Sequence, residues 1–595
     1  VDTGAMSVAG TVTLRHSDKP DFDIQGRGVP NYLGAASISP DGRSAWVPSK
    51  QDNVKRGTLR DGLGLTFQNT VRAISSRVDL VTDAEDYGAR VDHDNAGLAS
   101  AIAYDGLGIY LFAALETSRE VAVVDAHGAL EIFRINTGRA PQGLAFSRHS
   151  QTLYVANFMD RTVGVYDTST LLSEGIADVR LVATLAAVGT ERLGAQVLQG
   201  KRLFYDARDV RLAKDGYLSC ASCHNDGGHD GRVWDLTGFG EGLRNTVNLR
   251  GRAAGHGALH WSNNFDEVQD FEGQIRTLAG GTGLMTNAQF NTGTRAQPLG
   301  DKKAGVSGDL DALAAYVASL GAFAASPYRN PDGSLTASAS AGKSAFIARN
   351  CASCHGGSAF TNSAASNPQD IGTITAASGQ RLGATLSGID IPTLRDVWAT
   401  APYLHLGSAP TLQDAIRAHQ GLAVTDSELN DLAAYVREVG SQETTAPAGT
   451  SPTSGGLRGN YFNNMTLSGT PVLQRTEAVN FGWSSNSPGP GVNANKFSVR
   501  WTGMVKAPSN GKYRFRTVSN DGVRLWINGV RVVNNWTDHA TTSDTSADIT
   551  LQAGLKYSVT MEFYDNTGGA VARLQWRKPG QTTFAAIPAS SLSTN

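Results

Sequence analysis

The sequence predicts a multidomain chain with a strand-rich, β-propeller-like N-terminal region, a mainly α-helical core and a C-terminal β-sandwich. Its 595 residues exceed the roughly 100–200 residues of a typical domain. Alternating strand patterns fill both ends of the chain, whereas helical spacing gathers in the middle. A Ser/Thr/Pro/Gly-rich stretch at residues 441–456 is typical of a flexible linker. We therefore expect domains at residues 1–185, 186–440 and 457–595.

Residues 1–185 carry a weak repeat that predicts propeller blades. Tyr110 and Tyr154 occupy equivalent places in two copies and are 44 residues apart, which is about the length of one blade. A third copy contains Trp46. A propeller closes with about four to eight blades, and this stretch holds three or four. We therefore expect a small or incomplete propeller, with an irregular β domain as the alternative.

Five segments of the core have apolar residues three and four positions apart, as amphipathic helices do. They cover residues 195–204, 310–320, 342–349, 411–420 and 426–439. All the cysteines of the chain lie between the first and the fourth of these segments. The sequence therefore places its chemistry in the helical core.

Charge and hydropathy exclude two classes of partner. The chain has 52 Lys and Arg residues against 54 Asp and Glu residues, which gives a net charge of −2. Without a basic excess, binding to nucleic acid has no electrostatic support. No run of about 18 or more apolar residues occurs, so we expect no transmembrane helix.

The four cysteines form two copies of a C-x-x-C-H motif. The copies are Cys220, Cys223 and His224, and Cys351, Cys354 and His355. This motif attaches c-type haem through two thiols, and the adjacent His ligates the iron. A zinc site would leave both histidines unexplained, and a thioredoxin-like pair needs a βαβ context that is missing. We therefore expect two covalently bound haem c groups. Because such attachment takes place outside the cytoplasm, we expect a periplasmic or secreted protein.

His419 is the candidate for a second axial ligand. It shares the apolar stripe of the predicted helix at 411–420 with Leu412 and Ile416. Met285 is the only methionine between residues 186 and 440, which disfavours Met ligation of both irons. A buried core histidine is the alternative role for His419. The other histidines of the core are His229, His256, His260 and His405.

Five short motifs accompany the cysteines in a fixed order. They are G-K-R-L-F-Y-D at 200–206, L-S-C-A-S-C-H at 218–224, R-N-T-V-N-L at 244–249, I-P-T-L-R at 391–395 and A-P-Y-L-H-L-G at 401–407. Together they resemble the bacterial di-haem cytochrome c peroxidase and MauG family over residues 190–440. The resemblance implies an oxidoreductase whose first haem reacts with peroxide or another small oxidant. Its second haem would relay electrons to or from a redox partner protein or protein substrate.

The same resemblance implies roles for single residues. In that family the distal ligand of the second haem follows the P-Y-x-H-x-G segment, as Met in peroxidases and Tyr in MauG, and His419 occupies that place. A Trp between the haems corresponds to Trp261, with core packing as the alternative. For the acid that assists peroxide cleavage we favour Glu272, and His260 is a further candidate on the distal side. Asp270, Glu267 and Gln269 of the same segment are further candidates, and solvated carboxylates on a helix face are the alternative for all of them.

The C-terminal segments G-L-R-G-N-Y-F at 456–462 and S-N-D-G-V-R-L-W-I-N-G at 519–529 resemble the protective-antigen-type carbohydrate-binding sandwich. Lectin members of that family hold Ca²⁺ against sugar hydroxyls with an Asp-Asp pair. Here the pair is Asn520 and Asp521, which keeps two oxygen donors and loses one charge. The resemblance implies calcium and glycan binding, with a purely structural sandwich as the alternative.

The sequence as a whole predicts an exported di-haem oxidoreductase, either a peroxidase or a MauG-like enzyme. Two alternatives without substrate chemistry stay open. One is a cell-surface electron-transfer protein in which both irons are saturated. The other is a glycan-binding adhesin.

Overall fold

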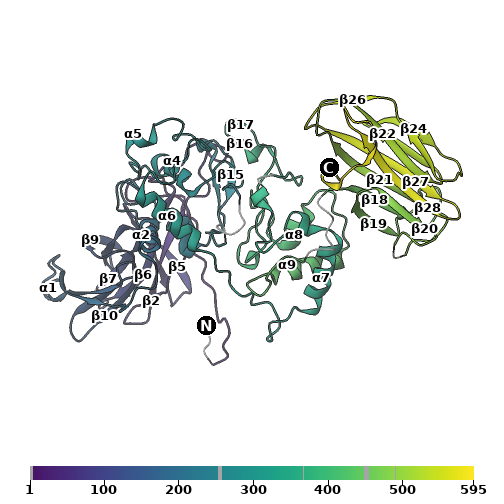
Figure 1. Ribbon diagram of the computed structural model, residues 1–595. Helices are drawn as coiled ribbons and strands as arrows, with labels where there is room; N and C mark the ends of the chain where they lie inside the picture. The colour runs from purple at the N-terminus through teal and green to yellow at the C-terminus, as the bar shows by residue number, and fades with distance from the viewer. Residues whose placement is uncertain (1–3, 252–256, 366–367, 448–454, 490, 595) are drawn as a thin grey trace. The chain divides into compact units, whose positions relative to one another are not determined.

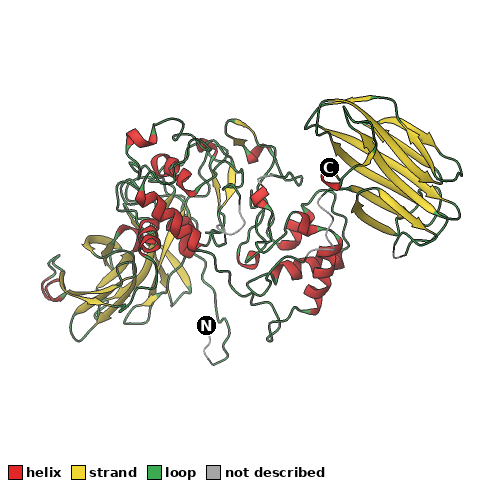
Figure 2. Cartoon of the chain, viewed as in Figure 1, coloured by secondary structure: helices red, strands yellow, loops and turns green. Residues whose placement is uncertain are grey.

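The computed structural model describes residues 4–251, 257–365, 368–447, 455–489 and 491–594. Contacts divide the chain into two compact units, Val1–Pro447 and Ala448–Asn595. The first unit contains the helices α1 to α9 and three N-terminal sheets, and the second is built from strands (Figures 1 and 2). Within the described ranges, no helix is both long enough and apolar enough to cross a bilayer. Part of the expected linker, residues 448–454, lies outside these ranges.

Three antiparallel sheets form the N-terminal region. The first contains β1 (Val29–Asn31), β2 (Ser37–Ile38), β3 (Ser44–Asp52), β4 (Val71–Asp79) and β5 (Ala84–His93). The second contains β6 (Ala99–Tyr104), β7 (Tyr110–Leu115), β8 (Glu120–Asp125) and β9 (Leu130–Asn136). The third contains β10 (Pro141–Ser147), β11 (Thr152–Asn157), β12 (Thr162–Asp167) and β13 (Arg180–Ala186), with α1 (Ser169–Glu174) before its last strand.

The expected sheet-rich region is confirmed, but its described residues form no closed propeller. Three sheets are fewer than the roughly four blades that a closed ring needs. Loops at one end of the sheets pack on the helical core instead. The Ala207 N–H donates to the Thr117 carbonyl at 2.8 Å, and the Ser118 hydroxyl donates to the Gly216 carbonyl at 3.2 Å.

The core is helical but consists of short helices joined by long loops. Its helices are α2 (Ala195–Phe204), α3 (Ala221–His224), α4 (Glu272–Thr277), α5 (Asn287–Phe290), α6 (Gly308–Ser319), α7 (Ala337–Ala348), α8 (Leu412–Arg417) and α9 (Asp426–Arg437). Two small hairpins, β14 (Val233–Asp235) with β15 (Leu243–Asn245) and β16 (Gln380–Arg381) with β17 (Ala384–Thr385), lie among them. Each of the five predicted helices overlaps one of these.

Two helix pairs in the core make the same contact. In the pair α2 and α6, Gly200 lies so close to Ala312 that a Cβ atom would be 1.8 Å from its carbonyl oxygen. In the pair α7 and α9, Gly342 has the same spacing to the carbonyl oxygen of Asp431. Only glycine permits this approach, because any side chain would overlap the partner backbone. One pair accompanies each cysteine motif.

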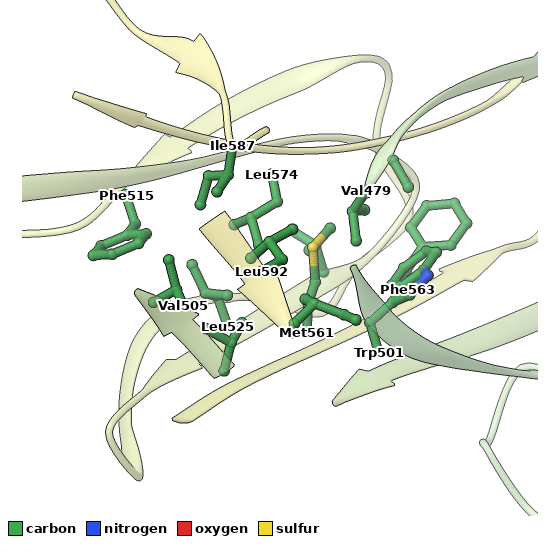
Figure 3. Close-up of a cluster of buried hydrophobic side chains, with 14 of the residues drawn as sticks. Val479, Trp501, Val505, Phe515, Leu525, Met561, Phe563, Leu574, Ile587 and Leu592 are labelled. Carbon is green, nitrogen blue, oxygen red and sulfur yellow. The ribbon is translucent and has the colours of Figure 1, made fainter. Parts of the chain in front are cut away.

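The second unit is a sandwich of two antiparallel sheets. One sheet has the order β19 (Leu473–Glu477), β18 (Leu457–Phe462), β21 (Phe497–Lys506), β27 (Lys556–Asp565), β23 (Val523–Ile527) and β24 (Val530–Asn535), with β30 (Leu592–Ser593) on β21. The other has the order β20 (Asn480–Ser484), β28 (Ala570–Arg577), β22 (Gly511–Asn520) and β25 (Thr542–Thr545), with β26 (Ile549–Leu551) and β29 (Ala585–Ala586) attached. Alternate residues such as Tyr513 and Phe515 are buried. Figure 3 shows the shared core, which includes Trp501, Met561 and Phe563.

Candidate functional site

The first C-x-x-C-H motif forms α3, which is preceded by Cys220. The thiols of Cys220 and Cys223 are both free. Nδ1 of His224 donates to the Gly228 carbonyl oxygen at 3.1 Å, so Nε2 is the nitrogen left to bind a metal. Burial lowers the pKa of His224 to about 4. Its imidazole is therefore neutral near pH 7, as metal binding requires.

The second motif repeats this arrangement. Cys351 and Cys354 are also free thiols. Nδ1 of His355 donates to the Pro392 carbonyl oxygen at 3.2 Å. Burial, together with the nearby His419, lowers the pKa of His355 to about 4. Both motifs therefore present a neutral imidazole beside two unmodified thiols.

His419 faces His355, with 6.5 Å between the two ring centroids. Its Nδ1 is 3.0 Å from the Ala415 carbonyl oxygen, which leaves Nε2 as the free nitrogen. The predicted helix ends earlier than expected, because α8 stops at Arg417. His419 therefore lies two residues beyond the helix and is half-buried. The apolar spacing therefore predicted this helix but not where it ends.

These residues fit a covalently attached haem. Metal–imidazole bonds are about 2 Å long and a ring centre lies about 1 Å from its nitrogens, so two imidazoles on opposite sides of one metal have centroids about 6 Å apart. The separation of 6.5 Å between His355 and His419 agrees with this value. Free thiols at both motifs are what thioether attachment needs.

A cavity of about 270 Å³ lies beside the first motif. Cys220, Cys223 and His224 line it. Most of its wall is apolar and includes Leu203, Phe204, Leu218 and Trp234. Leu65 and Thr70 of the N-terminal region also line it. The first site is therefore built by the core and the sheet region together.

Besides the motif itself and Asp206, the ionisable side chains that line the cavity are Glu241, Arg244 and His260. One carboxylate oxygen of Glu241 is 2.9 Å from Nδ1 of His260, and the other accepts from Nε of Arg244 at 2.6 Å. Burial opposes ionisation of Glu241, but the charges of His260 and Arg244 outweigh it and lower the pKa of Glu241 to about 2. The rings of Phe265 and Phe271 flank His260 at 4.3 and 5.0 Å. The imidazole is therefore fixed in orientation.

Trp261 lies between this cavity and the segment that follows the second motif. It lines the cavity and packs against Leu386 and Ile389. Its Nε1 donates to the Asn245 carbonyl at 2.9 Å, and its ring centroid is 6.4 Å from that of His405. The indole therefore contacts both the cavity beside the first motif and the segment that follows the second motif.

The structure does not bring Glu272 to the cavity. Its fully buried carboxylate accepts from Nε of Arg276 at 2.8 Å and from the Leu284 N–H at 2.9 Å. Asp270, from the same segment, pairs with Lys303 at 2.5 Å. Neither carboxylate is among the residues that line the cavity. Their contacts hold α4 in place, and Glu241 occupies the position near His260 instead.

Sequence reasoning missed Glu241 because its partner His260 is 19 residues away and reaches it only through the fold. The one available signal was that Glu241 lies three residues before Arg244, the first residue of the R-N-T-V-N-L motif. Of the other core histidines, His405 is buried with Nε2 2.8 Å from the Ser378 hydroxyl. His229 contacts the Ala399 carbonyl at 3.0 Å, and His256 lies outside the described residues.

In the second unit, Asp521 lies beside a buried carboxylate that the sequence did not indicate. Asp521 accepts from the N–H groups of His539 and Asn566 at 3.1 and 2.9 Å. Asp565 is fully buried, and neither of its carboxylate oxygens has a hydrogen-bond partner. Burial and the charge of Asp521 raise the pKa of Asp565 to about 6. The described residues contain no cluster of three or more His, Cys, Asp or Glu side chains around Asn520 or elsewhere that could hold a metal.

Two domain profiles match the chain. The PA14 domain matches residues 453–589, and the RoxA-like, cytochrome c-like profile matches residues 388–423. The second match includes the P-T-L-R segment, the P-Y-L-H-L-G segment and His419. The C-terminal unit is thus a PA14 β domain, and the end of the core is cytochrome c-like.

The curated relatives are proteins of different kinds. The anti-sigma-I factor RsgI3 of Acetivibrio thermocellus is 38% identical over 140 residues, which are 24% of this chain and 21% of that protein. Cytochrome c peroxidase Ccp of Escherichia coli is 28% identical over 270 residues, 39% of this chain and 56% of that protein. The gamma subunit of hydrazine synthase from Kuenenia stuttgartiensis is 26% identical over 273 residues, 39% of this chain and 72% of that protein.

The match thus covers only about a fifth of the length of RsgI3 and about half of the length of cytochrome c peroxidase Ccp. Among solved structures, the Kuenenia stuttgartiensis hydrazine synthase is 24% identical with a TM-score of 0.29, and the match covers 42% of this chain and 89% of that one. The peroxidase and cytochrome c-like similarities support covalent haem c and an oxidoreductase in general.

Proposed function

We propose that this protein is an exported di-haem c-type oxidoreductase of the peroxidase or MauG-like kind. One observation carries the proposal. Two identical C-x-x-C-H motifs present neutral, half-buried imidazoles, but only the first adjoins the cavity, whereas the second faces His419. This asymmetry supports one reactive and one saturated metal site. Similarity to cytochrome c peroxidase supports the reaction class.

Each motif has its own set of haem-holding residues. These sets are Cys220, Cys223 and His224 for the first haem, and Cys351, Cys354, His355 and His419 for the second. When bound, haem iron supplies the electron transfer and the reactivity with oxidants. In this proposal the first site would bind peroxide or another small oxidant. At the second site, His355 and His419 would hold a haem whose potential would be lower than that of a His/Met site and which would serve electron relay.

His260 and Glu241 handle the proton in the first cavity. The ionised carboxylate of Glu241 holds Nδ1 of His260, so Nε2 can give or take a proton within the cavity. Arg244 adds a fixed positive charge beside them. We place this pair ahead of Glu272, whose carboxylate is occupied by Arg276. Trp261 offers an aromatic group between the two halves of the core.

Localisation and partners follow from the cofactor. Covalent attachment of haem c supports a periplasmic, secreted or cell-surface location. The second haem would exchange electrons with a redox partner protein or a protein substrate. The PA14 domain supports glycan binding as a second function, and the unpaired Asp565 beside Asp521 favours a calcium-dependent form of it.

A peroxide titration of the holoprotein tests the proposal. We expect a mass that includes two porphyrins, one high-spin ferric signal that peroxide abolishes, and one low-spin signal from the second haem. Two low-spin haems that ignore peroxide would instead identify an electron carrier. A protein that matures without porphyrin would end the proposal.

A further inference from the structure

The two C-x-x-C-H motifs have the same sequence but different electrostatic surroundings. In the second motif, the neutral residue Asn362 binds two backbone carbonyls. Its Nδ2 donates to the Ser353 oxygen at 2.6 Å, and its backbone N–H donates to the Cys354 oxygen at 2.9 Å. In the first motif a cation takes this place, because Nζ of Lys50 donates to the Ser222 oxygen at 2.6 Å.

Lys50 and its neighbour Tyr32 come from the N-terminal sheet region. Lys50 is on β3, and Tyr32 follows β1. The Tyr32 hydroxyl donates to the Cys223 carbonyl at 3.1 Å, and its ring centroid is 4.5 Å from Nζ of Lys50. The sheet region therefore binds the same two carbonyls of the first motif that a core residue binds in the second.

The ammonium group of Lys50 is buried and paired. Its Nζ is 2.9 Å from Asp52 and 3.5 Å from Asp230, and all three side chains are 0% exposed. Burial opposes its charge, but the two carboxylates raise the pKa of Lys50 above its ordinary value. Asp230 also accepts from Nε1 of Trp234 at 3.0 Å, and Trp234 lines the cavity. Arg232 also pairs with Asp52, at 3.2 Å. The ammonium group of Lys50 is thus held against the turn of the first motif, and the two carboxylates balance its charge.

We propose that Lys50 is a positioning residue of the first haem site, where it fixes the C-x-x-C-H turn and raises the reduction potential of the attached haem. This inference rests on the proposed attachment of haem to Cys220 and Cys223. A nearby cation disfavours the more positive ferric state, and a buried charge is poorly screened by solvent. The N-terminal sheet region is then part of the redox centre.

Spectroelectrochemical titration of loaded variants tests this role. We expect Lys50→Met to lower the midpoint potential of the first haem, Asp52→Asn to raise it, and Lys50→Arg to leave it near the starting value. The second haem should not shift in any of them. Lys55→Met is the matched control, because Lys55 is an exposed lysine close by in sequence. Its charge is screened by water.

Opposite shifts in Lys50→Met and Asp52→Asn would support the proposal, since a loss of packing alone has no reason to follow the sign of the charge. Mass spectrometry of each variant separates the hypothesis that haem is attached at Cys220 from the hypothesis that Lys50 sets its potential. Absence of a porphyrin at Cys220 in the unaltered protein would count against the proposed function. Loaded protein with an unshifted first haem in both variants would overturn the role of Lys50 alone. If Lys50→Met does not fold, an unchanged potential in Asp52→Asn is sufficient to reject it.

Discussion

At the scale of single residues, backbone carbonyls decide which imidazole nitrogen each histidine offers. In His224, His355 and His419 alike, Nδ1 is engaged by a main-chain oxygen. The three oxygens belong to different segments, at Gly228, Pro392 and Ala415. It fixes the tautomer, so that Nε2 is the available ligand in all three.

Replacing His419 by Ala should change only the second haem. Loss of one imidazole leaves the iron there with an open axial position, so its low-spin ferric signal should become high-spin. The signal of the first haem should stay unchanged in absorption and electron paramagnetic resonance spectra. His149→Ala is the control, because His149 is exposed in a turn of the N-terminal sheet region. An unaltered low-spin signal would exclude His419 as a ligand.

Replacing Glu241 by Gln should affect the reaction with peroxide, whereas replacing Glu272 by Gln should affect stability. Glu241→Gln removes the charge that holds His260, so we expect the rate of reaction with peroxide to fall by about 10²–10⁴-fold, the usual range for a lost proton-transfer group. Glu272→Gln removes the partner of Arg276 and should cost about 2 kcal/mol of unfolding free energy. Stopped-flow and denaturant titrations distinguish the two effects. Equal peroxide rates in Glu241→Gln and the parent would contradict the role of Glu241.

At the scale of elements, the helix pairs could be predicted better than the sites that they support. Apolar spacing indicates α2, α6, α7, α8 and α9 because helix periodicity is local. The end of α8 at Arg417 depends on the following turn, in which the Gln420 N–H donates to the Ile371 carbonyl at 2.8 Å. That partner is 49 residues away. Spacing alone therefore extended the helix through His419.

The glycine contacts between paired helices give a prediction with a built-in control. Gly200→Ala or Gly342→Ala places a methyl group against a partner carbonyl, and we expect a loss of about 1–3 kcal/mol in unfolding free energy. Gly273→Ala, on α4, meets open space and should be neutral or stabilise by about 0.5–1 kcal/mol. Chemical denaturation of the apoproteins measures all three. A stabilising Gly200→Ala would show that the helices do not approach as closely as this.

At the scale of the whole molecule, the chemistry depends on contacts between regions that the sequence separates. The two C-x-x-C-H motifs are visible in the sequence because their function needs adjacent residues. The contact of Lys50 with Ser222 joins positions 172 residues apart, and no local pattern marks it. The repeat in residues 1–185 is a local pattern, so it predicted the sheets. Its three or four copies left open whether they close into a propeller, since closure depends on the number of sheets.

The two compact units should unfold in separate transitions with different chemical sensitivity. Only the PA14 unit contains the unpaired Asp565, whose pKa is raised from 3.8 to about 6. A raised carboxyl pKa means that the folded state binds the proton more tightly. Its stabilising effect is therefore complete below about pH 4 and is lost as the pH rises through 6. Calorimetry of the full chain should show one transition that moves to lower temperature between pH 4 and 7.

Calcium should reverse that shift at pH 7 and have little effect at pH 4, because Ca²⁺ binds ionised oxygen donors and stabilises the state that holds it. Asp565→Asn should remove both the pH dependence and the response to calcium. Asp548→Asn is the control, since Asp548 pairs with Arg514 at the surface of the same unit and surface pairs contribute little. The transition of unit Val1–Pro447 should respond to neither calcium nor these substitutions. A PA14 transition that ignores calcium at pH 7 would leave Asp521 and Asp565 without a role as metal ligands.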